Sequence, residues 1–155
     1  MTRPVTKEQF VDLLRPLATA LRAVDVDGPD GAARAEAVAP FDGAVVASVR
    51  QAALASIESP WLLPKAQAGI RFGRVVKDLE GFSVDAVLMD VPGPRHRHPN
   101  GEIDLCMATK GEPTFDGHPA GWVVYGTGSV HVPTVRAGEM LILYFLPGGA
   151  IEFGV

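Results

Sequence analysis

The stretch PGPRHRHPNGE, residues 92–102, places two histidines and a glutamate around a predicted turn. His96 and His98 are two positions apart, so an extended strand points both side chains to the same face. The residues Pro-Asn-Gly then favour a tight turn, and Glu102 opens the strand-like segment EIDLCMA, residues 102–108. A strand, a turn and a returning strand would bring this carboxylate back beside both imidazoles.

Two imidazoles and one carboxylate suit a borderline divalent ion such as zinc, iron, manganese, nickel or copper. A further ligand is expected from His131 in GTGSVHVP, where glycines allow a close backbone approach at a barrel rim. His118, in FDGHPAG, is expected to lie in a surface loop. The pattern H-x-H is common by itself, and a lone strand histidine is usually structural, so the metal site is predicted from the combination.

The chain from about residue 69 onward predicts a series of short strands. They are rich in β-branched and aromatic residues and are bounded by Gly, Pro, Asn or Asp, as in an antiparallel sandwich or barrel. The predicted strands are RFGRVV, FSVDAVLMDV, EIDLCMA, GWVVYG, SVHVPTV and EMLILYFL.

Residues 6–58 predict helices instead. Thr6 and Gln9 have the spacing of a capping box, and apolar residues then recur at helical spacing as far as Leu21. These apolar stripes need a surface to cover, so the helices are expected to pack outside the β-half. Two further helical stretches are expected, at about residues 32–38 and 42–57.

The two halves are expected to form a single domain, 1–155, with a helical segment at 1–66 and a barrel at 67–155. The composition is globular, with 47% hydrophobic and 21% charged residues. A net charge of −4 gives no basic patch for nucleic acid, and no apolar run could span a membrane. Because the one cysteine cannot form an intrachain disulfide and no signal peptide is expected, the cytoplasm is the expected location.

On these residues the chain resembles the cupin superfamily. The first cupin motif, G-x5-H-x-H-x(3,4)-E-x6-G, matches at His96, His98 and Glu102, and the second, G-x5-P-x-G-x2-H-x3-N, matches at His131. The resemblance implies a mainly β fold, a double-stranded β-barrel or jelly roll, with a divalent ion (zinc, iron, manganese or nickel) in its mouth. The framing residues depart from the motifs at Gly93, Gly126 and Val135.

Longer segments of the sequence resemble the 4-hydroxylaminobenzoate lyase family. The similarity lies in GIRFGRVVK, GPRHRHPNGEIDL and FDGHPAGWVVYGTGSVHVPTVRAGEMLILYFLPGGAIEF, together with a helical N-terminal segment. It implies conversion of 4-hydroxylaminobenzoate, a small aromatic acid, to protocatechuate (3,4-dihydroxybenzoate) with release of ammonia, in bacterial nitroaromatic degradation. Since cupins often dimerise, it also implies a homodimer.

That reaction needs a proton donor and a cation for the substrate carboxylate. The proposed catalytic residues are Glu102, Asp104 and Tyr125; Asp104 shares a strand face with Glu102, as does Cys106. Tyr144 is a further donor candidate.

The arginines of the β-half are the candidates for the cation that binds the substrate carboxylate. Arg95 and Arg97 alternate with the ligands and should face away from the metal, whereas either Arg71 or Arg74 could point inward. A ring pocket could be lined by aromatic residues that are equally suited to an ordinary core, namely Phe115, Trp122, Phe145 and Phe153.

Two other functions fit the same ligand set. One is another metallocupin enzyme, a dioxygenase or isomerase, because one barrel hosts many chemistries. The other is a non-enzymatic binding module, which the intact set of four ligands disfavours.

Overall fold

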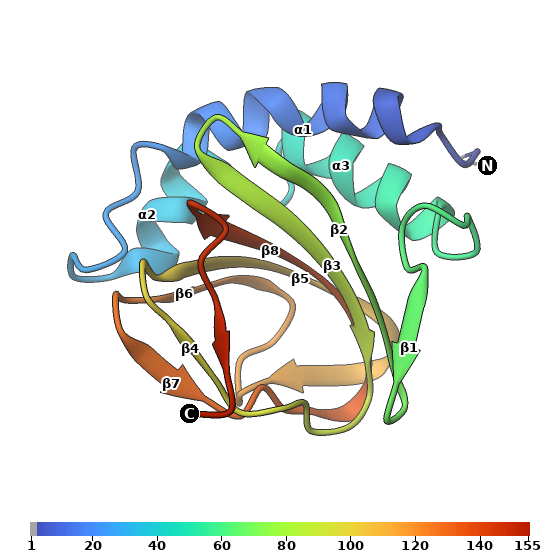
Figure 1. The fold of residues 1–155 in the computed structure, drawn as a ribbon. Coiled ribbons are helices and arrows are strands. Elements are labelled where there is room, and N and C mark those ends of the chain that lie inside the picture. Colours follow the sequence, from blue (N-terminus) through green and yellow to red (C-terminus); the bar gives the residue numbers. More distant parts are fainter. Residues whose placement is uncertain (1–2) are drawn as a thin grey trace.

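The structure, a computed structural model, describes residues 3–155 and arranges them in three layers (Figure 1). Residues 1 and 2, the start of the segment expected to be helical, lie outside the described residues. Helices cover one face of a six-stranded sheet, and a three-stranded sheet lies on its other side. Within residues 3–155, no helix has the length and apolar character needed to cross a membrane.

The three helices are α1 (Lys7–Leu21), α2 (Gly31–Val38) and α3 (Ala44–Ala55). The predicted capping box opens α1: Thr6 Oγ1 accepts a hydrogen bond from Gln9 N at 3.1 Å, and Gln9 Oε1 accepts one from Thr6 N at 2.9 Å. The last helix is shorter than predicted, because turns at residues 40–43 and 56–59 occupy its two ends.

The large sheet is antiparallel throughout and has the order β1-β2-β3-β8-β5-β6. Its strands are β1 (Lys65–Gln67), β2 (Ile70–Leu79), β3 (Phe82–Met89), β8 (Val135–Pro147), β5 (Glu102–Phe115) and β6 (Gly121–Tyr125). The strand β1 lies at the boundary between the two predicted segments and takes its first residues from the segment expected to be helical.

The small sheet has the order β7-β4-β9, with β7 (Ser129–His131), β4 (His96–His98) and β9 (Glu152–Phe153). The segment SVHVPTV was predicted as one strand, but the structure divides it between β7 and the start of β8. Pro133 lies at the break, where a residue without an N–H cannot continue a ladder.

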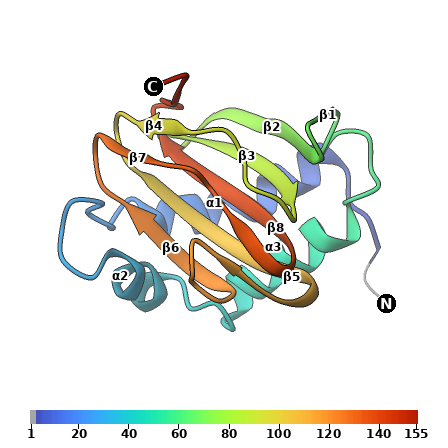
Figure 2. The ribbon, with the colours of Figure 1, turned by 90° about the horizontal axis from the view of Figure 1, so that it is seen from below.

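The large sheet has an apolar core on the side of the helices. Ile103, Leu105 and Met107 of β5 point into this core, and Trp122 Nε1 donates a hydrogen bond to Ala39 O at 2.8 Å. Seen from below, the helices lie behind this sheet (Figure 2). The predicted mainly β fold with a helical segment packed outside is confirmed.

Candidate metal centre

The four predicted ligands lie together between the two sheets. One ligand atom from each of His96, His98, Glu102 and His131 lies within 4.8 Å of all the others. In the small sheet His96 is directly opposite His131, and Glu102 begins β5 of the large sheet. The first three side chains are buried, and the His131 side chain is 13% exposed.

The local geometry follows the predicted strand, turn and strand. Both histidines of β4 point inward while Arg97 between them is exposed. Gly101 N–H donates to His98 O at 3.2 Å, and Gly101 has φ +85°. A Cβ at this position would lie 2.6 Å from a methyl group of Val26, so the turn requires glycine. The turn places Glu102 Oε1 3.2 Å from His98 Nε2.

Hydrogen bonds fix the orientation of each imidazole through its Nδ1 atom. His96 Nδ1–H donates to Pro94 O at 3.0 Å, and His131 Nδ1–H donates to Asp116 Oδ2 at 2.6 Å. The third ring, His98, is bonded through Nδ1 to Ser129 Oγ at 2.9 Å. Carbonyl and carboxylate oxygens only accept, so Nε2 of His96 and of His131 carries a lone pair when the ring is neutral.

These lone pairs point at one another. His96 Nε2 and His131 Nε2 are 3.1 Å apart, and Glu102 Oε2 lies 3.8 Å from His131 Nε2. Among residues 3–155, His98 Nε2 and both Glu102 oxygens are buried without a hydrogen-bond partner. Such atoms are costly to bury unpaired, and a cation between them would satisfy all of them at once. The donor set therefore fits a divalent metal ion.

The electrostatics favour the forms of these groups that bind metal. Burial lowers the pKa of His96, although the charge of Glu102 opposes this, and the neutral imidazole is the ligand form. Burial would raise the pKa of Asp116, but hydrogen bonds from His131, Tyr125 and Thr134 outweigh it and hold that pKa below its ordinary value. An ionised Asp116 keeps the proton on Nδ1 of its histidine.

Asp116 is the site residue that sequence reasoning missed. Its second partner is the Tyr125 hydroxyl, which donates to Oδ2 at 2.5 Å, and Thr134 N donates to Oδ1 at 2.8 Å. The Asp-Gly pair in FDGHPAG is of a type that favours a turn. It could not show that this turn folds back onto His131, fifteen positions later.

The remaining polar candidates lie where the alternation places them. Asp104 and Cys106 share the inner face of β5 with Glu102 and are buried. Both Asp104 oxygens lack a hydrogen-bond partner within residues 3–155; burial, and then the charge of Glu102, raise the Asp104 pKa well above its ordinary value. Tyr144 lies directly opposite Asp104 on β8 and is also buried.

The other histidine and the aromatic candidates divide between site, core and surface. His118 is exposed and is not part of the cluster. Trp122 and Phe145 belong to the core under the helices, whereas Phe115 has its ring 6.1 Å from that of His131. Phe153 of β9 has its ring 5.6 Å from that of His96.

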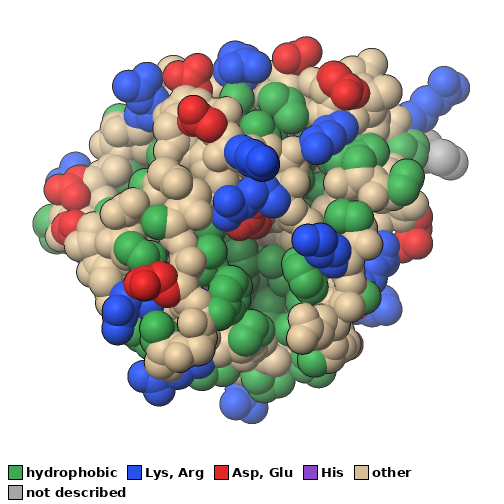
Figure 3. Space-filling model, viewed as in Figure 1, with side chains coloured by type: hydrophobic (Ala, Val, Ile, Leu, Met, Phe, Trp, Pro, Cys, Tyr) green, Lys and Arg blue, Asp and Glu red, His purple; other side chains and the backbone are tan. Residues whose placement is uncertain are grey.

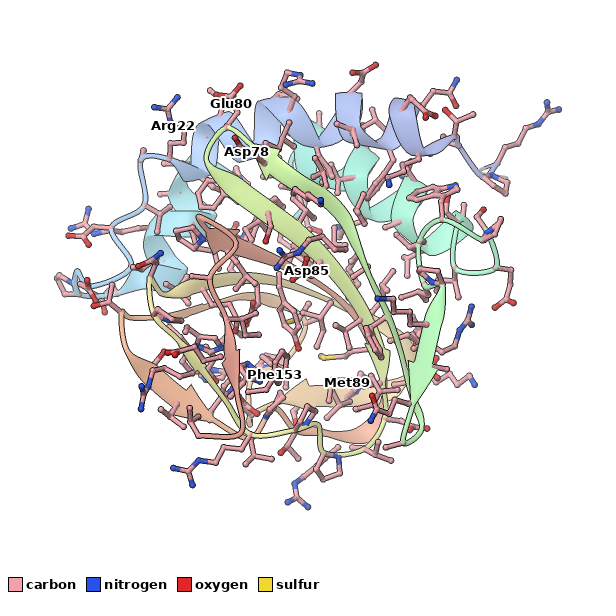
Figure 4. All side chains as sticks on the ribbon, in the orientation of Figure 1. Arg22, Asp78, Glu80, Asp85, Met89 and Phe153 are labelled. Atoms are coloured by element: carbon pink, nitrogen blue, oxygen red, sulfur yellow. The ribbon has the colours of Figure 1, made fainter. Side chains whose placement is uncertain are left out.

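A cavity of about 830 Å³ adjoins the cluster. In the space-filling view it is a hollow lined by hydrophobic side chains, with charged groups at its rim (Figure 3). Three lining residues, Asp85, Met89 and Phe153, surround the hollow in Figure 4. His96 also lines this cavity, so the cavity reaches the cluster of four candidate ligands.

Two antiparallel sheets that enclose a three-histidine, one-glutamate cluster define this protein as a cupin. A family model described as 4-hydroxylaminobenzoate lyase matches residues 32–153. The chain therefore belongs to the 4-hydroxylaminobenzoate lyase family, as its sequence suggests.

Two relatives are named 4-hydroxylaminobenzoate lyase. The one from Nocardioides sp. (strain LMS-CY) is 32% identical over 94 residues, which cover 55% of this chain and 55% of the relative. The one from Pseudomonas putida is 30% identical over 83 residues, which cover 51% of this chain and 47% of the relative. The chain thus spans about half the length of the curated relatives it matches.

Two solved structures are similar at lower identity. The DMSP lyase DddQ from Ruegeria pomeroyi DSS-3 is 17% identical, with a TM-score of 0.47 over 99% of this chain and 80% of that one. An RmlC-like cupin protein from Ralstonia eutropha JMP134 is 16% identical, with a TM-score of 0.44 over 61% of this chain and 73% of that one.

Proposed function

We propose that this protein is a metal-dependent lyase that converts 4-hydroxylaminobenzoate to protocatechuate and ammonia in nitroaromatic degradation. The observation that supports this most directly is the convergence of three Nε2 atoms and Glu102 beside an apolar cavity, in a chain of this lyase family. The reaction balances without an oxidant: one water is consumed, the ring gains two hydroxyls in total and the nitrogen leaves as ammonia.

His96, His98, Glu102 and His131 would hold the ion. When bound, a divalent ion of this kind supplies Lewis-acid assistance to cleavage of the N–O bond. The ligand chemistry fits zinc, iron, manganese or nickel.

The other residues of the site bind the ring, exclude water and manage protons. The apolar wall around Phe72, Val87 and Met89 accepts a benzene ring. Asp104 is the proposed proton donor because it is the buried polar side chain next to Glu102 on the inner face of β5. Tyr125 acts through Asp116, to which its hydroxyl donates, and so helps to position His131.

An anaerobic assay tests this function. Metal-loaded protein is incubated with 4-hydroxylaminobenzoate without dioxygen, and ammonia and protocatechuate are quantified. Equal amounts of both products are expected. Product that forms only with dioxygen would indicate a dioxygenase, and an absence of both products with all four metals would refute the proposed function.

We further propose a cytoplasmic homodimer. The single cysteine, Cys106, is buried and free, which suits a reducing compartment. Light scattering on the purified, metal-loaded protein tests the oligomeric state, and a monomer mass would contradict the dimer.

A further inference from the structure

The cavity beside the four candidate ligands is lined in part by an ion pair, Arg74 and Asp85. On β2 the cavity is lined by Ile70, Phe72, Gly73 and Arg74, and a Cβ added at Gly73 would meet Pro64. Arg74 therefore lies at the rim of a mostly apolar cavity, as an exposed residue.

Arg74 is held in place by two acceptors. Its Nε and Nη2 donate to the two carboxylate oxygens of Asp85 at 2.7 Å and 3.2 Å, and Nη2 also donates to Gly149 O at 3.2 Å. Within residues 3–155, its Nη1 makes no hydrogen bond to an acceptor. The Arg74 side chain lines the cavity and is 38% exposed, so the guanidinium is partly open to solvent.

The pair is aligned with the metal site across the large sheet. Arg74 is opposite Asp85, Asp85 is opposite Tyr144, and Tyr144 is opposite Asp104, two residues from Glu102. This row crosses three strand spacings of about 4.8 Å each on the inner face of a sheet that curves around the cavity. The neighbouring row, Phe72, Val87 and Ile142, is apolar.

We propose that Arg74 binds the carboxylate of an aromatic acid through its Nη1 edge, with Asp85 as the residue that positions the guanidinium. The ring then lies on the apolar row, and its para substituent points toward His96, which lines the same cavity. This inference rests on the proposed function for the identity of the substrate, but it assigns a binding site that can be tested without turnover.

The strand provides its own control. Arg71 lies on the same strand outside the cavity, where its Nη1 donates to Glu58 at 3.1 Å and its Nη2 to Ile57 O at 3.0 Å. The other cation in the cavity wall is Lys65, which is exposed on the edge strand β1.

The test compares two unreactive probes, 4-hydroxybenzoate and the uncharged 4-hydroxybenzamide, by isothermal titration calorimetry on the metal-loaded protein. Wild type should prefer the acid. Arg74→Gln should weaken binding of the acid about tenfold to a hundredfold, the usual range for a lost hydrogen bond to a charged group, and leave the amide unchanged. Arg71→Gln and Lys65→Gln should keep the preference.

A double variant protects the test against misfolding. Arg74→Gln alone leaves Asp85 without its partner, whereas Arg74→Gln with Asp85→Asn removes both charges and should lose the preference equally. The inference is overturned if the double variant still prefers the acid, if Lys65→Gln abolishes the preference instead, or if wild type binds no 4-hydroxybenzoate. A wild type that prefers the acid through Arg74 but releases no ammonia from 4-hydroxylaminobenzoate would refute the proposed function alone.

Discussion

Residues 102–107, the first part of strand β5, are buried on both faces, and the two faces differ in chemistry. Ile103 and Leu105 face the helices and are fully buried in an apolar core. Glu102 and Asp104 alternate with them, face the small sheet and are also fully buried. Apolar burial stabilises the fold, whereas an unpaired buried polar group costs about 1–3 kcal/mol. The buried polar residues of the inner face are therefore explained by their place at the candidate metal centre and not by stability. Substitutions on the inner face should impair metal binding, whereas substitutions on the outer face should lower the free energy of unfolding.

The largest expected effect is on the inner face, from His131→Ala. Loss of a hydrogen-bond partner to a ligand already costs ten- to hundredfold in metal affinity or activity, so loss of the ligand itself should cost more than about a hundredfold. Metal content by mass spectrometry and ammonia release measure this. His118→Ala, an exposed histidine outside the cluster, is the matched control and should behave as wild type. Equal activity in both variants would contradict the assigned metal centre.

Leu105→Ala tests the outer face. Removing this fully buried side chain should lower the free energy of unfolding by about 2–5 kcal/mol, because a cavity remains under the helices. Urea unfolding measures the loss. Metal bound per folded chain should stay at the wild-type value, and its loss from a folded Leu105→Ala protein would show that the two faces are not independent.

A smaller effect is expected at Asp116, which supports the site from outside the ligand set. Asp116→Asn replaces the ionised acceptor of His131 Nδ1–H with a neutral one and should weaken metal binding about ten- to hundredfold. Tyr125→Phe removes one of the hydrogen-bond donors to Asp116 and should weaken metal binding less than Asp116→Asn does. Competition with a chromophoric chelator measures both, and the reverse order would contradict the assigned roles.

The smallest expected effect is a change in the stability of the metal-free protein, caused by substitution of Asp104. Because burial and the neighbouring Glu102 raise the pKa of Asp104 in the folded state, its contribution to stability is full below the ordinary carboxyl pKa and is lost as pH rises through the raised pKa. Asp104→Asn should therefore make the metal-free protein more stable than wild type at pH 8, with little difference between the two at pH 4. Thermal unfolding at both pH values, after chelation, measures this, and parallel pH profiles would argue against it.

Local patterns predicted much of this molecule. Alternation at His96 and His98, and the Pro-Asn-Gly turn before Glu102, predicted which side chains share a face, since strand periodicity and turn geometry are short-range properties. The capping box at Thr6 was predicted for the same reason. The contact of Asp116 with His131 depends on how distant segments pack, and no spacing rule encodes that.

The arginines show the same limit. Alternation predicted that Arg71 and Arg74 lie on different faces of β2, but it could not tell which face would enclose a cavity. That choice depends on the register between β2 and β3, which places Asp85 opposite Arg74. The family resemblance predicted the barrel, and the pairing of its strands determined the cavity wall.

The small sheet is built from strands of three, three and two residues, too short to be stable alone. His96, His98 and His131 belong to it, while Glu102 belongs to the large sheet. An ion held by all four would join the sheets, so its binding energy would also be folding energy for the smaller one. The amide protons of β4 and β7 should then exchange rapidly with solvent until metal binds, while those of β5 and β8 exchange slowly in either state.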